Sequence, residues 1–274
     1  MIQLFIYENH NTATEFKQWK FPGGEVGVKL PAIPEGAAIR LLAMFPTSDD
    51  IMTLFNVFDA LKRQSIPKRL IRLEMPYFPY ARQDRVCAEG ESFALEVFCG
   101  MLKTHGHFGT LCTSDVHSKV SEFLLECSEF TYINLTQGKL SSKLPSFEHL
   151  FAPDRGAIRK ISQHDQVTRS YRPAWVAHFE KTRTAEGIVY IPAKHDFYQG
   201  ECCVVDDICD GGETFLKLGQ MLRETQPKLT ILSLYVTHGI FSNDTKFKQL
   251  LEIYDTIYVK YLMNDTYQQF VKVI

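Results

Sequence analysis

The stretch CCVVDDICDGGET, residues 202–214, carries the clearest information about the fold. It begins with an uninterrupted apolar run and then reaches two aspartates, which predicts a strand over residues 201–206 that is buried on both faces, as in parallel sheets. Phe215, Leu218 and Leu222 follow at the spacing of one helix face, so the glycines before them predict a turn into a helix. A buried strand, a glycine-rich turn and a helix form the repeating unit of an open parallel sheet.

The polar half of this stretch suits a ligand that carries both hydroxyl and phosphate groups. In open parallel sheets, ligands bind beyond the carboxyl ends of the strands, where Asp206 and Asp207 are expected. Carboxylates repel phosphate, but they accept hydrogen bonds from sugar hydroxyls and can bind Mg²⁺. The glycines within residues 210–214 let backbone N–H groups approach an anion at the helix N-terminus. The loop therefore fits a sugar phosphate, and the alternative is an ordinary strand-to-helix turn with an acidic N-cap.

The rest of the chain alternates between apolar runs and helical patterns, which is typical of α/β domains. Further strands are expected at residues 39–45, 69–75, 108–113, 150–153, 174–179, 188–191, 229–236 and 256–261. Further helices are expected after Thr47 or Ser48, over residues 93–102, and from about residue 156. In the first of these, one face carries Ile51, Leu54, Phe55, Phe58 and Leu61. The polar stretch TQGKLSSKLPS has the composition of a linker, so we expect two α/β domains, at residues 1–136 and 137–274.

The composition is that of a globular protein and excludes several other classes. The 274 residues are 45% hydrophobic, and 30 basic against 32 acidic residues give a net charge of -2. No nucleic-acid partner is indicated, because such proteins usually carry a basic domain or stripe. No apolar run is long enough to cross a bilayer, and MIQLFIYENH lacks the features of a signal peptide. We therefore expect a cytoplasmic protein with no membrane partner, whose seven cysteines are reduced and mostly buried.

Further motifs occur in order along the chain and carry a family resemblance. They are FPGGE (21–25), DALKR (59–63), PYFPYARQDR (76–85), SDVHS (114–118), APDRG (152–156), EKTR (180–183) and THGIFS (237–242). This ordered set resembles the motifs of the ribose-phosphate diphosphokinases, also called phosphoribosyl diphosphate synthetases. The stretch at residues 202–214 resembles the phosphoribosyl diphosphate loop of the type I phosphoribosyltransferase fold. The resemblance spans nearly the whole chain and implies two tandem domains of that fold, each with a mainly parallel sheet flanked by helices, and an active site between them.

The resemblance also implies a reaction and a role for each motif. Such enzymes move the β,γ-diphosphate of ATP to the C1 hydroxyl of ribose 5-phosphate and release AMP, with Mg²⁺ as cofactor and ATP as co-substrate. The implied catalytic residues are Lys181 and Arg183. The implied ATP-binding residues are Phe21, Glu25, Arg82, Gln83, Asp84 and His117. The implied ribose-phosphate-binding residues are Asp206, Asp207, Asp210, Gly211, Gly212, Glu213 and Thr214. The implied metal ligands are His117 and Asp154.

The chain departs from the family pattern in three places. Its sugar loop ends DGGET where the family has DTGGT, so Glu213 replaces a glycine where the 5-phosphate should be received. A carboxylate there is unfavourable unless it points away. FPGGE has Gly23 where the family has an aspartate that contacts adenine. The chain stops at Ile274, in the expected last strand and without the family's terminal helix, and that strand could return to the N-terminal domain.

The altered sugar loop leaves the acceptor open. Ribose 5-phosphate is the acceptor of the family, and we favour it. ADP-ribose is the alternative, as in a phage-type variant that serves NAD salvage, because its 5-phosphoryl group is an ester with less charge and more bulk. A phosphoribosyltransferase with a base as acceptor would explain the loop but not PYFPYARQDR.

Two further expectations concern catalysis and self-association. A non-catalytic regulatory relative is a third reading, but the presence of Lys181, Arg183 and both loop aspartates disfavours it. Family members bind adenine at a subunit interface, so Phe21 and Glu25 imply self-association as a dimer or a hexamer.

Overall fold

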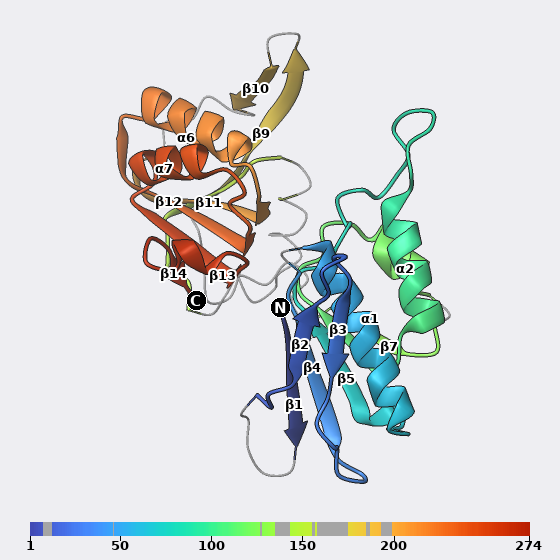
Figure 1. Ribbon diagram of the computed structural model, residues 1–274. Coiled ribbons are helices and arrows are strands. Elements are labelled where there is room, and N and C mark those ends of the chain that lie inside the picture. Colours follow the sequence, from blue (N-terminus) through green and yellow to red (C-terminus); the bar gives the residue numbers. More distant parts are fainter. Residues whose placement is uncertain are drawn as a thin grey trace. The chain divides into compact units, whose positions relative to one another are not determined.

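The protein is described by a computed structural model that covers residues 1–7, 13–45, 47–126, 128–134, 143–154, 157, 175–184, 187–192 and 199–274. For residues 7, 175–184 and 187–192 only the backbone is described. The chain divides into two compact units, Met1–Leu135 and Thr136–Ile274 (Figure 1). Most of the helix expected from about residue 156 lies outside the described residues.

The first unit is built on a sheet with the strand order β1-β4-β5-β6-β7. Its strands are β1 (Ile2–Tyr7), β4 (Ala38–Ala43), β5 (Ile71–Met75), β6 (Thr110–Thr113) and β7 (Thr131–Asn134). Strands β4 to β7 run parallel, whereas β1 is antiparallel to β4. The helices are α1 (Ser48–Arg63), α2 (Ala94–His105) and α3 (Val120–Leu125), and a short 3-10 helix, Lys68–Leu70, precedes β5. A separate hairpin of β2 (Lys17–Lys20) and β3 (Val26–Lys29) lies against α1 (Figure 1).

Helix α1 forms for the reasons that the sequence pattern indicates. The backbone N–H of Thr47 donates to the carboxylate of Asp50 at 3.1 Å, and this capping box starts the helix where the sequence predicted. Leu54, Phe58 and Leu61, three residues of the predicted apolar face, are at most 1% exposed. Full burial of such side chains contributes roughly 1.5–3 kcal/mol each, so this face holds the helix in the core of the unit.

The second unit is built on a sheet with the strand order β10-β9-β8-β11-β12-β13-β14. Its strands are β8 (His149–Ala152), β9 (Trp175–Thr184), β10 (Gly187–Pro192), β11 (Gln199–Cys209), β12 (Lys228–Gly239), β13 (Thr256–Leu262) and β14 (Lys272–Val273). The helices are α6 (Glu213–Thr225) and α7 (Asp244–Ile253), and a 3-10 helix, Asp265–Tyr267, follows β13. All neighbouring strands are parallel except β9 and β10, which form a hairpin that projects from the rest of the sheet (Figure 1). The last strand, β14, pairs with β13 and so lies in the second sheet.

Strand β11 is longer than the sequence indicates. The sequence predicted that this strand ends at Asp206. It continues to Cys209, so Asp206 and Asp207 both lie inside the strand. The physical reason is its neighbour β12, which extends equally far and pairs with β11 from Gln199 to Cys209. Because backbone pairing continues past the first carboxylate, a charged side chain is a poor marker of where this strand ends.

The sequence missed several short or peripheral elements. They are β1, β2, β3, α3, β7 and α7, whereas the last strand expected at the end of the chain corresponds to β14. The antiparallel β1 also makes the first sheet mixed rather than wholly parallel. Five of the described cysteines are buried, as expected, and Cys87 is exposed. Of the helices that the structure describes, none combines the length and the apolar character that crossing a membrane requires.

Candidate active site

The first group of polar loops lies where β5 and β6 end. Met75 and Thr113, the last residues of these parallel strands, are paired in the sheet. The loops PYFPYARQDR and SDVHS therefore leave the sheet side by side, and the N–H of Ser114 donates to the carbonyl of Pro76 at 3.0 Å. Parallel strands thus bring together two motifs that lie far apart in the sequence.

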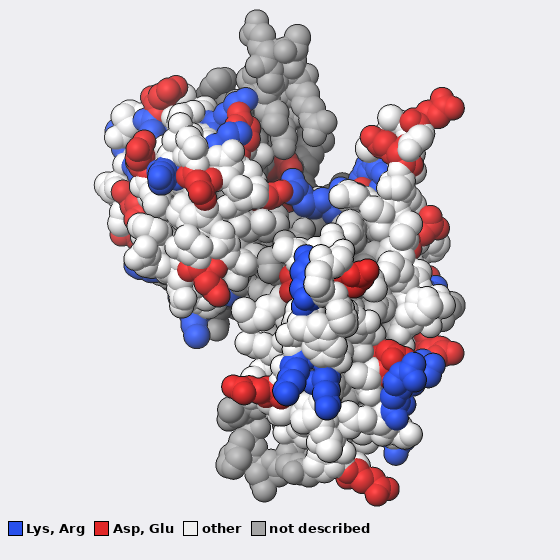
Figure 2. Space-filling view, in the orientation of Figure 1, with Lys and Arg blue, Asp and Glu red and all other residues white. Residues whose placement is uncertain are grey.

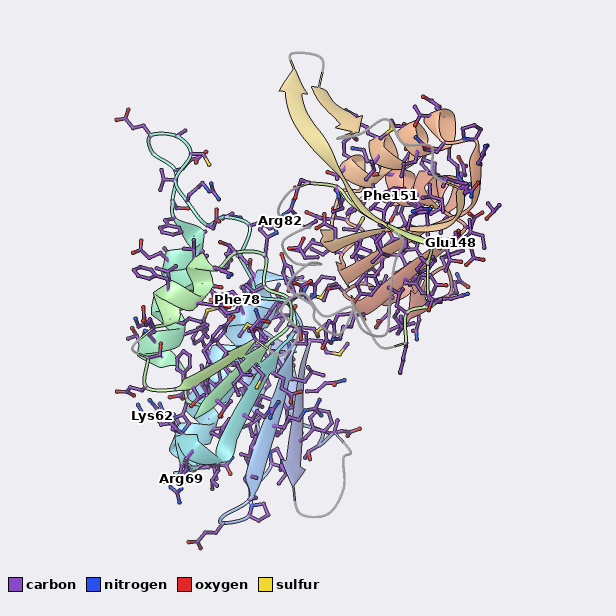
Figure 3. The ribbon with its side chains drawn as sticks, turned by 180° about the vertical axis from the view of Figure 1, so that it is seen from behind. Lys62, Arg69, Phe78, Arg82, Glu148 and Phe151 are labelled. Atoms are coloured by element: carbon purple, nitrogen blue, oxygen red, sulfur yellow. The ribbon has the colours of Figure 1, made fainter. Side chains whose placement is uncertain are left out.

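The PYFPYARQDR loop is held by its apolar residues. Phe78 is 2% exposed, and its ring packs edge-on against Phe98 of α2 with centroids 5.5 Å apart. Tyr80 has a left-handed backbone with φ of 61°, which turns the chain outward. Figure 3 shows Phe78 within the unit and Arg82 at its end, far from Arg69, which precedes β5. The aromatic residues therefore fix the base of the loop and leave Arg82 at the surface.

The two loops line one pocket of about 650 Å³ within the first unit. Its lining residues are Arg82, Gln83, Asp84, Arg85, Cys87, Glu91, Ser92 and His117. The structure thus brings together four of the residues for which the resemblance implies ATP binding. Two arginines and a histidine at the mouth of a polar pocket are suited to an anion such as a polyphosphate.

Asp84 accepts hydrogen bonds from both loops that line this pocket. Its carboxylate accepts hydrogen bonds from Nε and Nη2 of Arg85 at 2.7 and 3.0 Å, and from Oγ of Ser118 at 2.7 Å. The Arg85 guanidinium, aided by the Ser118 hydroxyl, holds the pKa of Asp84 below its ordinary value. Because Ser118 belongs to the SDVHS motif, Asp84 ties the two loops to each other.

Sequence reasoning missed two residues that support the pocket. The first is Ser118, which holds Asp84, and the second is Glu91. The carboxylate of Glu91 accepts the backbone N–H groups of Cys87 and Ala88 at 2.8 and 3.1 Å, and so closes the loop after the arginines. Glu91 lies in no quoted motif, and a glutamate that caps a loop has no distinctive sequence signal.

The FPGGE motif lies at the turn of the β2–β3 hairpin and does not line this pocket. Phe21 is 49% exposed, and its N–H donates to the carbonyl of Glu25 at 2.8 Å. The carboxylate of Glu25 lies over Gly23, and a Cβ atom on Gly23 would come within 2.7 Å of it. The space that a side chain at position 23 would need is therefore occupied by Glu25, which explains how this turn accommodates a glycine there.

The second group of polar loops lies at the carboxyl edge of the second sheet. Val204 of β11 pairs with Phe151 of β8, and Asp207 and Asp154 each lie three residues further along their parallel chains. Both aspartates are therefore at the same edge of the sheet. One oxygen of Asp154 accepts the N–H of Ala157 at 3.0 Å.

The two loop aspartates differ in their surroundings. Asp207 is only 4% exposed, whereas Asp206 is half-buried and accepts the N–H of Asp207 at 2.9 Å. Beyond them, the carbonyl of Cys209 accepts the N–H groups of Ile240 and Phe241 at 2.8 and 3.1 Å. These bonds join the sugar loop to the THGIFS loop at the end of β12.

The glycines and Glu213 form the turn into α6. Gly212 is the N-cap residue with φ of 82°, a conformation that glycine adopts without strain. One carboxylate oxygen of Glu213 lies 2.6 Å from Nζ of Lys246, and the other lies 3.1 Å from Nζ of Lys217. The hydrogen bonds from Lys246 and then from Lys217 lower the pKa of Glu213. The carboxylate that replaces the family glycine is therefore neutralised by two ammonium groups.

Lys181 and Arg183 lie on β9, where only the backbone is described. They pair with Tyr190 and Ile188 of β10 in the projecting hairpin. Strand β9 also pairs with β8, and this pairing ends at His178, opposite Ala152. Both basic residues therefore lie on the part of β9 that extends past the carboxyl end of β8.

The two implied metal ligands lie in different units, His117 in the first and Asp154 in the second. Within the described parts of the chain, no group of three or more His, Cys, Asp or Glu side chains is arranged to hold a metal ion. A hard ion such as Mg²⁺ keeps several waters and usually takes one or two carboxylates together with substrate phosphates. The donors present fit that mode of binding and not an all-protein cage.

Comparisons with known proteins agree with this architecture. A model of the N-terminal domain of ribose phosphate pyrophosphokinase matches residues 7–106. A ribose-phosphate pyrophosphokinase from Ureaplasma parvum is 27% identical over 256 residues, which cover 90% of this chain and 74% of the relative. Another, from Pyrococcus abyssi, is 28% identical over 230 residues, which cover 81% of this chain and 75% of the relative. The crystal structure of phosphoribosylpyrophosphate synthetase from Mycobacterium smegmatis matches with a TM-score of 0.70 at 22% identity, over 90% of this chain and 80% of that one.

Two α/β units with mainly parallel sheets, and with polar loops at the carboxyl edges of those sheets, define a protein with two tandem phosphoribosyltransferase-like domains. The fold class predicted from the sequence is thus confirmed. Within this class, the chain is similar to ribose-phosphate pyrophosphokinases, which are diphosphotransferases. The resemblance inferred from the ordered motifs is confirmed as well.

Proposed function

We propose that this protein transfers the β,γ-diphosphate of ATP to the C1 hydroxyl of ribose 5-phosphate. The C1 oxygen attacks the β-phosphorus and loses its proton, the bond between that phosphorus and the α,β-bridging oxygen breaks, and AMP leaves. The products are phosphoribosyl diphosphate and AMP. Similarity to ribose-phosphate pyrophosphokinases supports the reaction in general, and the loops of the two units support its parts.

The observation that carries this proposal is the sugar loop at the end of β11. Asp206 and Asp207 place carboxylates at the sheet edge, where they would accept hydrogen bonds from ribose hydroxyls. Residues 210–214 lead into α6, whose first turn offers N–H groups and the positive end of the helix dipole to a phosphate. Glu213 does not oppose this role, because both of its oxygens are held by lysines. The loop therefore retains acceptors for hydroxyls on one side and donors for phosphate on the other.

The pocket of the first unit would bind ATP. Arg82, Gln83 and His117 line it and offer hydrogen-bond donors to phosphate oxygens. Phe21 and Glu25, on the β2–β3 hairpin, lie outside this pocket and would reach the adenine of a nucleotide in a neighbouring subunit. A dimer or hexamer is therefore part of the proposal.

Magnesium fits the donors that the chain provides. When bound, Mg²⁺ would supply positive charge that neutralises the transferring diphosphate. His117 and Asp154 would hold it or its waters. Lys181 and Arg183, on the projecting hairpin, would stabilise negative charge on the transferring group.

ADP-ribose is a second candidate acceptor, and one observation favours it. Apart from the two chain neighbours of Gly211, no described residue has an atom within 4 Å of the place where a Cβ atom on Gly211 would stand. Open space beside the phosphate loop would accommodate a substituent on the 5-phosphoryl group. The reaction would be the same diphosphate transfer to a free anomeric hydroxyl.

The acceptor can be tested by measuring AMP release from ATP and Mg²⁺ with ribose 5-phosphate, ADP-ribose or unphosphorylated ribose. We expect ribose 5-phosphate to stimulate AMP release and ribose to leave it at background. Stimulation by ADP-ribose alone would replace the first candidate by the second. Background release with all three compounds would favour a non-catalytic regulatory relative.

The role of the hairpin can be tested with Lys181→Ala. Loss of a charge-stabilising group should lower kcat by about 10³-fold while ATP binding stays measurable. Lys62→Ala is the matched control, because Lys62 is an exposed residue at the far end of the first unit from Arg82 (Figure 3). Near-normal turnover of Lys181→Ala would refute the proposed role of Lys181.

A further inference from the structure

A cluster of three charged residues lies at the sugar loop, and two of them, Lys217 and Lys246, belong to none of the family motifs. Glu213 begins α6, Lys217 lies one turn further along the same helix, and Lys246 comes from the first turn of α7. Each lysine is paired with a different oxygen of the Glu213 carboxylate, Lys246 at 2.6 Å and Lys217 at 3.1 Å. Figure 2 shows acidic and basic side chains next to one another over α6 and α7.

Stability does not explain this arrangement well. The side chains of Glu213, Lys246 and Lys217 are 44, 36 and 35% exposed, so solvent and salt screen the two ion pairs. Two ammonium groups against one carboxylate leave the cluster with a net charge of +1. The cluster therefore adds positive charge next to a loop that already suits an anion.

Lys246 is the lysine that stands next to the loop. Its Cβ atom would lie 3.6 Å from a Cβ atom on Gly212, the N-cap residue of α6. The preceding residue, Gly211, is open: apart from its two chain neighbours, no described residue has an atom within 4 Å of its Cβ position. The Lys246 side chain therefore begins next to Gly212 and ends at the carboxylate of Glu213, the first residue of α6.

The position of Lys246 is set by Glu213. A lone lysine on a helix surface samples many rotamers, whereas an ion pair at 2.6 Å holds its ammonium group at the start of α6. Asn243 also fixes the first turn of α7, since its side-chain oxygen accepts the N–H of Lys246 at 3.0 Å. Backbone and side chain of Lys246 are therefore both held.

We propose that Lys246 is a phosphoryl-binding residue of the acceptor site and that Glu213 positions it. This inference rests on the proposed function, because it takes residues 210–214 as the loop that receives the 5-phosphoryl group. The N–H groups at the start of α6 would bind one side of that group, and the ammonium of Lys246 would bind another. Glu213 then acts as the residue that orients the lysine, which accounts for a carboxylate where the family has glycine.

Steady-state kinetics can test the role of Lys246 with Lys246→Met and Lys217→Met as matched variants. Both remove one lysine from the same carboxylate, but only Lys246 adjoins the loop. We expect Lys246→Met to raise the KM for ribose 5-phosphate by about 10-fold or more, as for a lost hydrogen bond to a charged group. The kcat and the KM for ATP should stay within about 3-fold, Lys217→Met should resemble the wild type, and Lys246→Arg should restore most of the affinity.

The positioning role of Glu213 needs its own variant, Glu213→Gln. If the carboxylate only repels phosphate, its removal should lower the KM for ribose 5-phosphate. If it orients Lys246, the KM should rise, although less than in Lys246→Met, and the double variant Glu213→Gln, Lys246→Met should be no worse than Lys246→Met alone. A lower KM in Glu213→Gln, or equal effects of Lys246→Met and Lys217→Met, would overturn the inference.

A binding measurement separates failure of this inference from failure of the proposed function. Ribose 5-phosphate should raise the Tm of the wild-type protein in the presence of ATP analogue and Mg²⁺ more than unphosphorylated ribose does. Lys246→Met should lose this difference and Lys217→Met should keep it. Binding by the wild type without AMP release would refute the proposed reaction and leave Lys246 supported. An unchanged Tm difference in Lys246→Met would refute the role of Lys246 whatever the reaction.

Discussion

The two polar loops that we propose as phosphate-binding sites are built in different ways. The loop after β5 carries its charges on long side chains, Arg82 and Arg85, above a base of buried aromatic rings. The loop after β11 has a glycine N-cap and relies on the backbone at the start of α6. In the proposed site of the first loop, side chains would bind the ligand and the backbone would support them, whereas in that of the second loop the backbone itself would form much of the binding surface.

This difference determines which substitutions each loop tolerates. A side-chain site depends on the residues that hold it from beneath, so its weak point is the apolar anchor. A backbone site depends on its φ and ψ angles, so its weak point is a glycine. Substitutions at the apolar anchor and at the glycine therefore test this contrast.

The largest effect is expected for the anchor of the first loop. Phe78→Ala removes a ring that is 2% exposed and packs on Phe98, so it should leave a cavity and destabilise the unit by about 3–5 kcal/mol. Urea unfolding followed by circular dichroism measures the change. Phe21→Ala is the control, because Phe21 is 49% exposed and its truncation should change the free energy of unfolding far less. Equal effects of the two variants would contradict an anchoring role for Phe78.

A smaller effect is expected for the glycine turn of the second loop. Gly212→Ala places a side chain on a residue with φ of 82°, 3.3 Å from Cδ1 of Leu250, which should destabilise the unit by about 1–2 kcal/mol. Gly211→Ala is the matched control, since the described residues leave open space around its Cβ position, and its effect should stay within about 0.5 kcal/mol. If Gly211→Ala proved as destabilising as Gly212→Ala in urea unfolding, the turn would not depend on the conformation of Gly212.

The same contrast explains what the sequence could predict. The apolar strands and the face of α1 were predictable, because burial imposes a period on the sequence, and Leu54, Phe58 and Leu61 are buried as expected. The true end of β11 was not, because it depends on the length of its neighbour β12. Strand β1 was missed because one short edge strand gives a weak signal, and its antiparallel direction depends on long-range pairing with β4.

For the candidate site, motifs predicted which residues would gather but not how each would be held. Arg82, Gln83, Asp84 and His117 line one pocket, as their motifs implied, although their roles remain predictions. The pairing of Glu213 with Lys217 could have been anticipated from their spacing of four residues on a helix. The pairing with Lys246 could not, because it joins two helices, and the packing of α6 on α7 decides it.

The smallest effect is expected for the charges of the first loop, and it concerns the pKa of Asp84. Because Arg85 holds this pKa below the ordinary value of 3.8, Arg85→Met should raise it. A carboxylate with a lowered pKa in the folded state stabilises the protein above the pKa of the unfolded state, and this contribution is lost as the pH falls through the folded-state pKa. The difference in stability between wild type and Arg85→Met should therefore exist at neutral pH and be lost as the pH falls from about 3.8 through the lower pKa of the folded state.

Titration of the Asp84 carboxyl carbon by NMR measures the shift directly. Arg63→Met is the control, since Arg63 is about as exposed as Arg85 and pairs with Asp59 at 2.6 Å, and its replacement should leave the titration of Asp84 unchanged. Ser118→Ala should raise the pKa of Asp84 less than Arg85→Met does, because a neutral hydroxyl donates a weaker hydrogen bond than a guanidinium. If Arg85→Met left the pKa of Asp84 unchanged, the Arg85 side chain would not be the group that stabilises this carboxylate. The contrast between a side-chain site and a backbone site would then not hold.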